Sequence, residues 1–146
     1  MKKETKSKKT PFSIEAKFPA DLSVLAFLRN GVYNLLKQKP EIGEKLARRA
    51  QVITDELCTN AIQHGSEKNG EIQFTLEYIK DKKSSEEGEI KITVKDQGKE
   101  KRKTRRNQKI HGRGLKIVQS WSDKFKTTKT KTNGTKVQST IKTPNS

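Results

Sequence analysis

Positive charge is concentrated in three segments of this chain of 146 residues. Residues 1–10 carry five positive side chains and one negative one, residues 99–113 carry eight and one, and residues 124–146 carry six and none. Because the net charge of the whole chain is +16, the remaining residues are together close to neutral, at −1. Residues 1–10 also contain no Leu, Ile, Val or Phe, and residues 99–113 contain only Ile110. We therefore expect a nearly neutral folded body with three basic appendages, the first of which, residues 1–10, is a disordered tail.

The length fits one folded domain, which we place at residues 11–143. The one cysteine, Cys58, cannot form an internal disulfide, and we expect a small packing residue rather than a reactive thiol. No apolar run approaches the roughly 20 residues of a membrane span or the uninterrupted apolar centre of a signal peptide. These features favour a cytoplasmic protein without a membrane segment.

Periodicity predicts a strand and a helix in the first part of the chain. Residues 12–18 alternate apolar and polar side chains, as a half-buried strand does. Asp21 is a candidate N-cap for a helix that follows and ends before Pro40. The apolar residues expected to form one stripe on this helix are Leu22, Leu25, Leu28, Val32 and Leu35.

A second and longer helix is predicted from about residue 42 to residue 64. Its apolar face is expected to contain Leu46, Ala50, Ile53, Leu57 and Ala61. Two alternating segments, residues 71–79 and 89–96, should form an antiparallel hairpin, and helical spacing returns in residues 114–121. A closing hairpin is expected around Asn133 and Gly134, a turn pair whose second residue tolerates a positive φ.

Three groups of residues could support chemistry. Glu56, Asn60 and His64 are four residues apart and form a polar line on the long helix, although such a line is usually the solvent edge. Asp96 and Gly98 follow a predicted strand, and could also make an ordinary Asp turn. Gly112 and Gly114 open a helix, where unpaired backbone N–H groups and the positive end of the dipole favour phosphate.

These signals become more specific because four segments follow one another in a particular order along the chain: ELCTNAIQHG, VKDQG, GRGLKIVQ and NGTKVQSTI. They resemble the N box, the two glycine boxes and the closing Gly-Thr of the GHKL (Bergerat-fold) ATPase domain found in gyrase, Hsp90, histidine kinases and MutL. The similarity is greatest to a small bacterial branch, the anti-sigma-factor serine kinases, and covers residues 12–142. It implies an α+β fold, a two-layer sandwich in which a mixed, mostly antiparallel sheet carries about three helices on one face.

The resemblance also implies a role for each matching residue, with ATP and Mg²⁺ as cofactors. Asn60 corresponds to the Mg²⁺ ligand, and Glu56 to the general base. Asp96 corresponds to the residue that accepts a hydrogen bond from the adenine amino group, and Gly98 allows the backbone to approach the base. The remaining nucleotide-binding positions would be His64, Gly112, Arg113, Gly114, Leu115 and Thr135. For His64, a helix-terminal residue that complements the dipole is an equal alternative.

The expected lid, residues 99–111, departs from the family pattern. It is short and basic, and Glu100 stands where the first glycine box normally has its second glycine. The lid could contact the triphosphate or bind another anionic partner. No GxxxxGK[ST] motif offers a different phosphate loop.

Three functions remain open on the sequence. The first is an ATP-dependent serine/threonine protein kinase that, by resemblance, binds a sigma factor and phosphorylates an anti-sigma-factor antagonist, with a homodimer allowed. The second is a non-catalytic nucleotide-binding or protein-interaction module. The third, a charge-driven nucleic-acid binder, is the least favoured. The basic run of the lid has no aromatic residue to stack on a base, which argues against a single-strand platform, although the run permits phosphate contacts.

Overall fold

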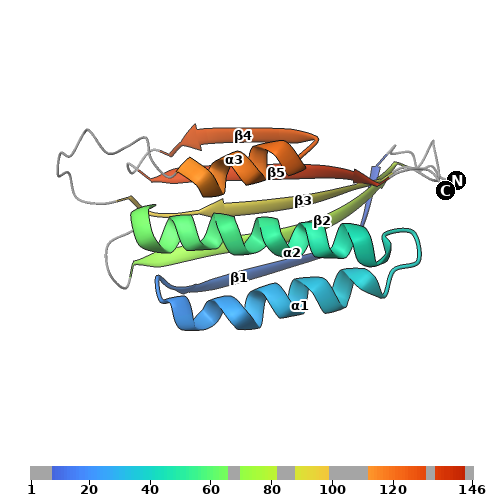
Figure 1. The fold of residues 1–146 in the computed structure, drawn as a ribbon, viewed down its shortest axis with the longest axis horizontal. Coiled ribbons are helices and arrows are strands. Elements are labelled where there is room, and N and C mark those ends of the chain that lie inside the picture. Colours follow the sequence, from blue (N-terminus) through green and yellow to red (C-terminus); the bar gives the residue numbers. More distant parts are fainter. Residues whose placement is uncertain (1–7, 66–69, 82–87, 99–111, 131–133, 144–146) are drawn as a thin grey trace, which may run out of the picture.

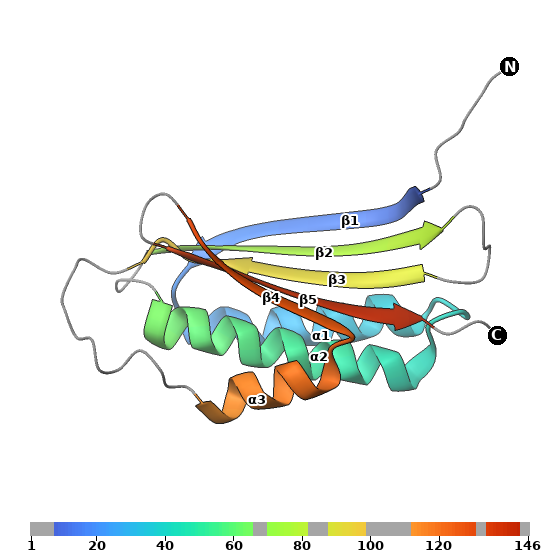
Figure 2. The same ribbon diagram turned by 90° about the horizontal axis from the view of Figure 1, so that it is seen from above.

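The protein is a two-layer sandwich, seen here in a computed structural model that describes residues 8–65, 70–81, 88–98, 112–130 and 134–143. All helices of this part of the chain cover one face of a five-stranded sheet (Figures 1 and 2). The strand order is β1-β2-β3-β5-β4, and each neighbouring pair is antiparallel. The α+β sandwich is therefore confirmed, with a sheet that is antiparallel throughout the described strands.

The elements follow the order expected from periodicity. The strands are β1 (Lys8–Pro19), β2 (Glu71–Asp81), β3 (Gly88–Lys95), β4 (Lys124–Lys129) and β5 (Thr135–Thr143). The helices are α1 (Leu25–Lys37), α2 (Gly43–Asn60) and α3 (Gly112–Trp121), with a short 3₁₀ turn (Leu22–Val24) before α1 and a π-helical turn (Ala61–Gly65) after α2. Residues 8–10, which we expected in the tail, belong to β1, where Lys8 and Lys9 pair with Asp81 and Lys80 of β2.

The core lies between the sheet and the helices. One face of each central strand is buried, because side chains alternate across the sheet. This face carries Ile72, Phe74, Leu76 and Tyr78 from β2, and Ile90, Ile92 and Val94 from β3. Ala50, Ile53 and Leu57 of α2 and Ala61 of the π-helical turn are buried, as expected, while Leu46 is partly buried.

The apolar stripe of α1 differs from the expected one at both ends. Asp21 does act as an N-cap, since its Oδ1 accepts a hydrogen bond from Ser23 N at 3.0 Å, but it caps the 3₁₀ turn. The tighter turn leaves Leu22 47% exposed. At the other end Leu36 is fully buried, whereas Leu35 is only partly buried. The helix thus begins three residues late and uses Leu36 to complete its stripe.

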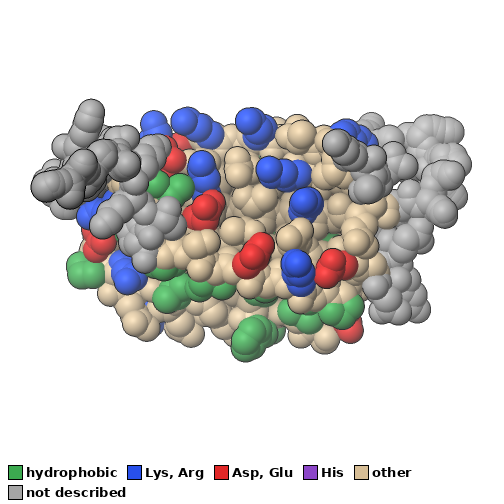
Figure 3. Space-filling model, turned by 180° about the vertical axis from the view of Figure 1, so that it is seen from behind, with side chains coloured by type: hydrophobic (Ala, Val, Ile, Leu, Met, Phe, Trp, Pro, Cys, Tyr) green, Lys and Arg blue, Asp and Glu red, His purple; other side chains and the backbone are tan. Residues whose placement is uncertain are grey.

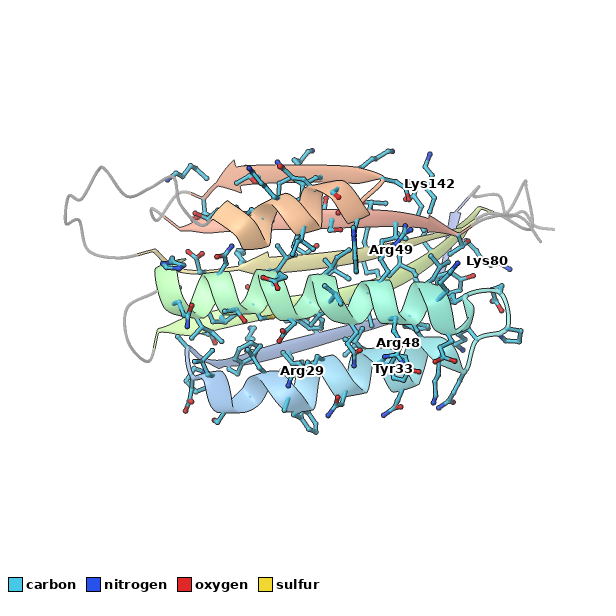
Figure 4. The ribbon with its side chains drawn as sticks, viewed as in Figure 1. Arg29, Tyr33, Arg48, Arg49, Lys80 and Lys142 are labelled. Carbon is cyan, nitrogen blue, oxygen red and sulfur yellow. The ribbon has the colours of Figure 1, made fainter. Side chains whose placement is uncertain are left out.

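Polar contacts join α1 to α2 on the outer surface of the helical layer. Arg29 Nη1 lies 3.0 Å from Asp55 Oδ1, and the Tyr33 hydroxyl donates to Glu44 Oε2 at 3.0 Å. Arg48 lies beside Tyr33 at the boundary between the two helices (Figure 4) and pairs with Glu44 at 3.3 Å. These are the only two ion pairs within the described residues.

The third basic segment is not an appendage. Residues 124–129 and 135–143 form β4 and β5, and β5 lies inside the sheet between β3 and β4. Ile141 and Ser139 on β5 are fully buried. Lys124, Lys126, Lys136 and Lys142 occupy outward positions of these strands, while inward positions such as Phe125, Ser139 and Ile141 face the core.

Candidate nucleotide-binding site

The predicted site residues come from segments that end or begin at the same end of the molecule. The last turn of α2, the end of β3, the start of β5 and the first turn of α3 all lie at this end (Figures 1 and 2). α2 also contacts β3, β5 and α3. The fold therefore brings together four segments that are far apart in the sequence.

Asp96 is the most firmly positioned of these residues. It follows β3 directly and is only 8% exposed. Its Oδ1 accepts hydrogen bonds from Gly98 N at 3.0 Å and from Thr135 N at 3.1 Å. Its backbone N–H donates to Thr135 O at 2.9 Å. The carboxylate is thus held by its own turn, in which Gly98 has a φ of +81°, and by the first residue of β5.

Two glycines allow neighbouring segments to approach Asp96. A Cβ at Gly65 would overlap Oδ2 of Asp96, and a Cβ at Gly134 would overlap its backbone oxygen. Gly65 ends the π-helical turn after α2, while Gly134 precedes β5. The hairpin expected around Gly134 is present, since β4 and β5 pair antiparallel, but Gly134 does not use the positive φ that glycine tolerates: among the described glycines only Gly43 and Gly98 have one. Gly134 is needed for close approach instead.

The end of α2 carries the polar residues proposed to act on phosphate. Glu56 and Asn60 are one helical turn apart, and both are partly buried. Beyond Asn60 the helix widens into the π turn of residues 61–65, a feature often found at functional sites. His64 lies in this turn with an exposed side chain, so it does not continue a strictly α-helical line from Glu56 and Asn60.

Only some of the residues predicted to bind phosphate are among those that the structure describes. Gly112, Arg113 and Gly114 form the first turn of α3, whose backbone N–H groups have no partner within the helix. Leu115 is partly buried and packs against the core. The expected lid, residues 99–111 with Glu100, lies outside the described residues.

The donors present fit a magnesium ion that is shared with a nucleotide. No group of three or more His, Cys, Asp or Glu side chains in the described part of the chain could hold a metal. Mg²⁺ in phosphate-transfer sites is bound by one or two protein oxygens, with water and phosphate oxygens as the other ligands. Asn60 would supply one such oxygen from a partly buried position.

Comparison with known proteins identifies the domain. A family model described as the histidine kinase-like ATPase domain matches residues 18–141. The chain belongs to the histidine kinase-like ATPase family. This match spans every described segment of the candidate site, from the end of α2 to the start of β5.

A solved structure shares the fold of this histidine kinase-like ATPase domain. It contains the RsbU and RsbW domains of Rv1364c from Mycobacterium tuberculosis, with a TM-score of 0.60 and 13% sequence identity. The similarity covers 91% of this chain but 33% of that chain, so the domain spans about a third of the neighbour. No curated protein matches the sequence. Within its described helices, the domain has no segment with the length and hydropathy that crossing a membrane requires.

The sequence supplied candidate site residues for this ATPase domain, but not all the residues that position them. The role of Gly65 depends on its distance from Asp96, which lies on another element. Gly65 closes the polar line of the long helix, and Gly134 precedes the closing strand. Both glycines were visible in the sequence, but only the packing of α2 and β5 around Asp96 explains them.

Proposed function

We propose that the domain binds ATP with Mg²⁺ and acts as a serine/threonine protein kinase of the anti-sigma-factor type. The observation that carries the ATP part is the position of Asp96. Its carboxylate is nearly buried, fixed by two backbone donors and enclosed by Gly65 and Gly134. A fixed carboxylate accepts a hydrogen bond from the amino group of adenine, and it repels the carbonyl oxygen that guanine has at the same position.

The remaining residues suit the transfer of a phosphoryl group. Bound ATP would supply this group, and Mg²⁺ would neutralise the developing charge. Asn60 would hold the metal through its amide oxygen. Glu56, one turn earlier on α2, would accept the proton from the attacking hydroxyl group. The N–H groups of Gly112 and Gly114 would bind phosphate oxygens at the start of α3.

The partners are proposed from the neighbour and from the resemblance. The solved neighbour contains an RsbW domain together with an RsbU domain, which supports a role in partner switching. We propose a sigma factor and an anti-sigma-factor antagonist as the partners, in the cytoplasm, with the antagonist as the phosphate acceptor. A non-catalytic nucleotide-binding module is the alternative, favoured by the Glu100 substitution in the first glycine box.

Variants of α2 test catalysis separately from binding. Asn60→Ala should lose the part of the ATP affinity that depends on Mg²⁺. Glu56→Ala should keep ATP bound but slow the formation of ADP by about 100-fold or more. ATP affinity is measured by calorimetry with and without Mg²⁺, and ADP formation by a coupled assay.

Asp55→Ala is the matched control for Glu56→Ala. It removes a neighbouring carboxylate of the same helix, one that pairs with Arg29 on the α1 side, and should leave turnover unchanged. A wild-type protein that binds ATP but never forms ADP or phosphorylates an antagonist would establish the non-catalytic alternative. Equal slowing in Asp55→Ala and Glu56→Ala would show that Glu56 is not the base.

A further inference from the structure

The face of the sheet opposite the helices carries a basic surface that the ATP site does not use. The helices cover only one face, and the other is open along its length (Figure 2). On this face, outward positions of β3, β5 and β4 hold six lysines and one glutamate, Glu89. We call the surface formed by these outward positions the basic face, and its lysines are Lys91, Lys95, Lys124, Lys126, Lys136 and Lys142.

The charge is unevenly distributed across the open face. In Figure 3 positive side chains gather over the β4 side, and most of the negative ones lie nearer to β1. Lys91 is opposite Glu77 of β2, and Lys142 is opposite Glu89 of β3. The other four lysines have no acidic residue directly opposite them in the described pairs. No lysine of the basic face takes part in either ion pair of the described residues.

One pair within the basic face is unfavourable for folding. Lys95 of β3 and Lys136 of β5 are direct cross-strand partners, and both are exposed. Like charges directly opposite one another destabilise a sheet. Lysines at sheet edges can prevent aggregation, which would explain Lys124 and Lys126 on β4. That explanation does not apply to Lys95 and Lys136, because β3 and β5 are interior strands.

The other side chains of the basic face indicate what kind of anion it fits. Other outward positions beside the lysines hold Thr93, Gln138 and Thr128. Gln138 Nε2 donates a hydrogen bond to Thr93 Oγ1 at 3.0 Å. Lysine, threonine and glutamine are residues that contact phosphate. Protein interfaces instead depend on aromatic, Met and Arg residues and are depleted in Lys. The outward positions of these three strands contain none of those anchor residues.

The dimensions of the basic face suit a duplex. Neighbouring strands are about 4.8 Å apart, so the lysines of β3 and β4 form rows separated by about 10 Å. Such rows can reach phosphates on both sides of a minor groove about 6 Å wide, as in B-form DNA. With no aromatic side chain in these outward positions, there is no platform for stacking single-stranded bases.

We propose that the basic face binds the phosphate backbone of double-stranded DNA without regard to sequence. This surface is distinct from the lid, whose composition argues only against a platform for single-stranded bases. It lies on the face of the sheet opposite α2 and α3, so DNA binding need not block the nucleotide site.

The experiment measures binding of the full chain to fluorescently labelled duplexes of about 20 bp, at salt concentrations from about 50 to 200 mM. The test variant is Lys95→Gln with Lys136→Gln. Removing two phosphate contacts should lower the slope of log affinity against log salt by about 1.8, and should weaken binding equally for duplexes of different sequence. Its melting temperature should not fall, because an opposed like-charge pair is removed.

The matched control is Lys37→Gln with Lys45→Gln, which removes two exposed lysines from the helical layer. This control should retain the wild-type slope. An equal loss in both variants would overturn the proposal, because binding would then follow net charge rather than the basic face. An unchanged slope in the test variant, or binding only to anionic vesicles, to RNA duplexes or to an acidic protein, would also overturn it.

Discussion

The carboxylate of Asp96 is held by backbone groups of two neighbouring segments. Thr135 and Gly98 donate backbone N–H groups to Oδ1, while Gly65 and Gly134 leave room for the carboxylate and for the backbone oxygen. The hydrogen bonds fix the orientation of the group, and the glycines let two elements close around it. A residue that recognises a base needs this rigidity, because an acceptor that can turn away discriminates poorly between donors and acceptors.

Gly65→Ala should therefore weaken ATP binding more than it weakens folding. The new methyl group would displace the carboxylate and break its hydrogen bond from Thr135 of β5, with an expected loss of about tenfold in ATP affinity. Calorimetry gives the affinity and urea denaturation gives the stability.

Gly31→Ala is the control for that substitution. A Cβ at Gly31 meets nothing within 4 Å, and the residue lies inside α1. This variant should keep the wild-type ATP affinity and gain about 0.5–1 kcal/mol of stability. Unchanged ATP affinity in Gly65→Ala would show that the close approach has no role in binding.

The thiol of Cys58 should be unreactive in the folded protein. Burial, with a smaller contribution from the charge of Asp55, raises the pKa of Cys58 to about 12 from its usual value of 9.0. At pH 8 the folded protein should react with Ellman's reagent only as fast as it unfolds. Rapid reaction of the native protein would contradict this.

The raised pKa of Cys58 also makes the stability of the protein depend on pH. A thiol whose pKa is raised on folding loses its proton first in the unfolded chain, so its contribution to stability should decline as the pH rises from about 9 toward 12. The Cys58→Ala variant should lack this component of the alkaline destabilisation.

At the scale of elements, periodicity located each helix and strand, but the sequence could not assign its ends or its exposed sides. Leu22 fits the helical spacing of α1, yet the 3₁₀ turn capped by Asp21 leaves it half exposed. The sequence indicates only a turn residue at Gly134, before β5, but the need for glycine there comes from Asp96, 38 positions earlier. Contacts of this kind are set by tertiary packing, which local propensity does not contain.

Leu22 and Leu36 test the observed apolar stripe of α1, which includes Leu36 but not Leu22. Leu36→Ala should cost about 2–5 kcal/mol of unfolding free energy, because the side chain is fully buried and its removal leaves a cavity. Leu22→Ala should change the stability by less than about 1 kcal/mol, because that side chain is 47% exposed. Urea denaturation measures both, and similar costs for the two variants would favour the original stripe with Leu22 in the core.

At the scale of the whole molecule, the sheet separates two regions of different chemistry. The layer between sheet and helices is apolar, and at one of its ends the segments of the proposed ATP site meet. The opposite face of the sheet is polar and carries the lysines of β3, β5 and β4. The net charge of +16 therefore has a structural location in part: six of its positive residues lie on one face of three strands.

The central claim is that Asp96 selects adenine, and calorimetric titration with ATP and GTP in the presence of Mg²⁺ tests it most directly. The wild-type protein should bind ATP and should bind GTP about 100-fold more weakly, or not at all. Asp96→Asn keeps an oxygen for the two backbone donors but can present an amide donor to the base, so its ATP affinity and its preference for ATP should both fall. Equal affinities of the wild-type protein for ATP and GTP would contradict the account.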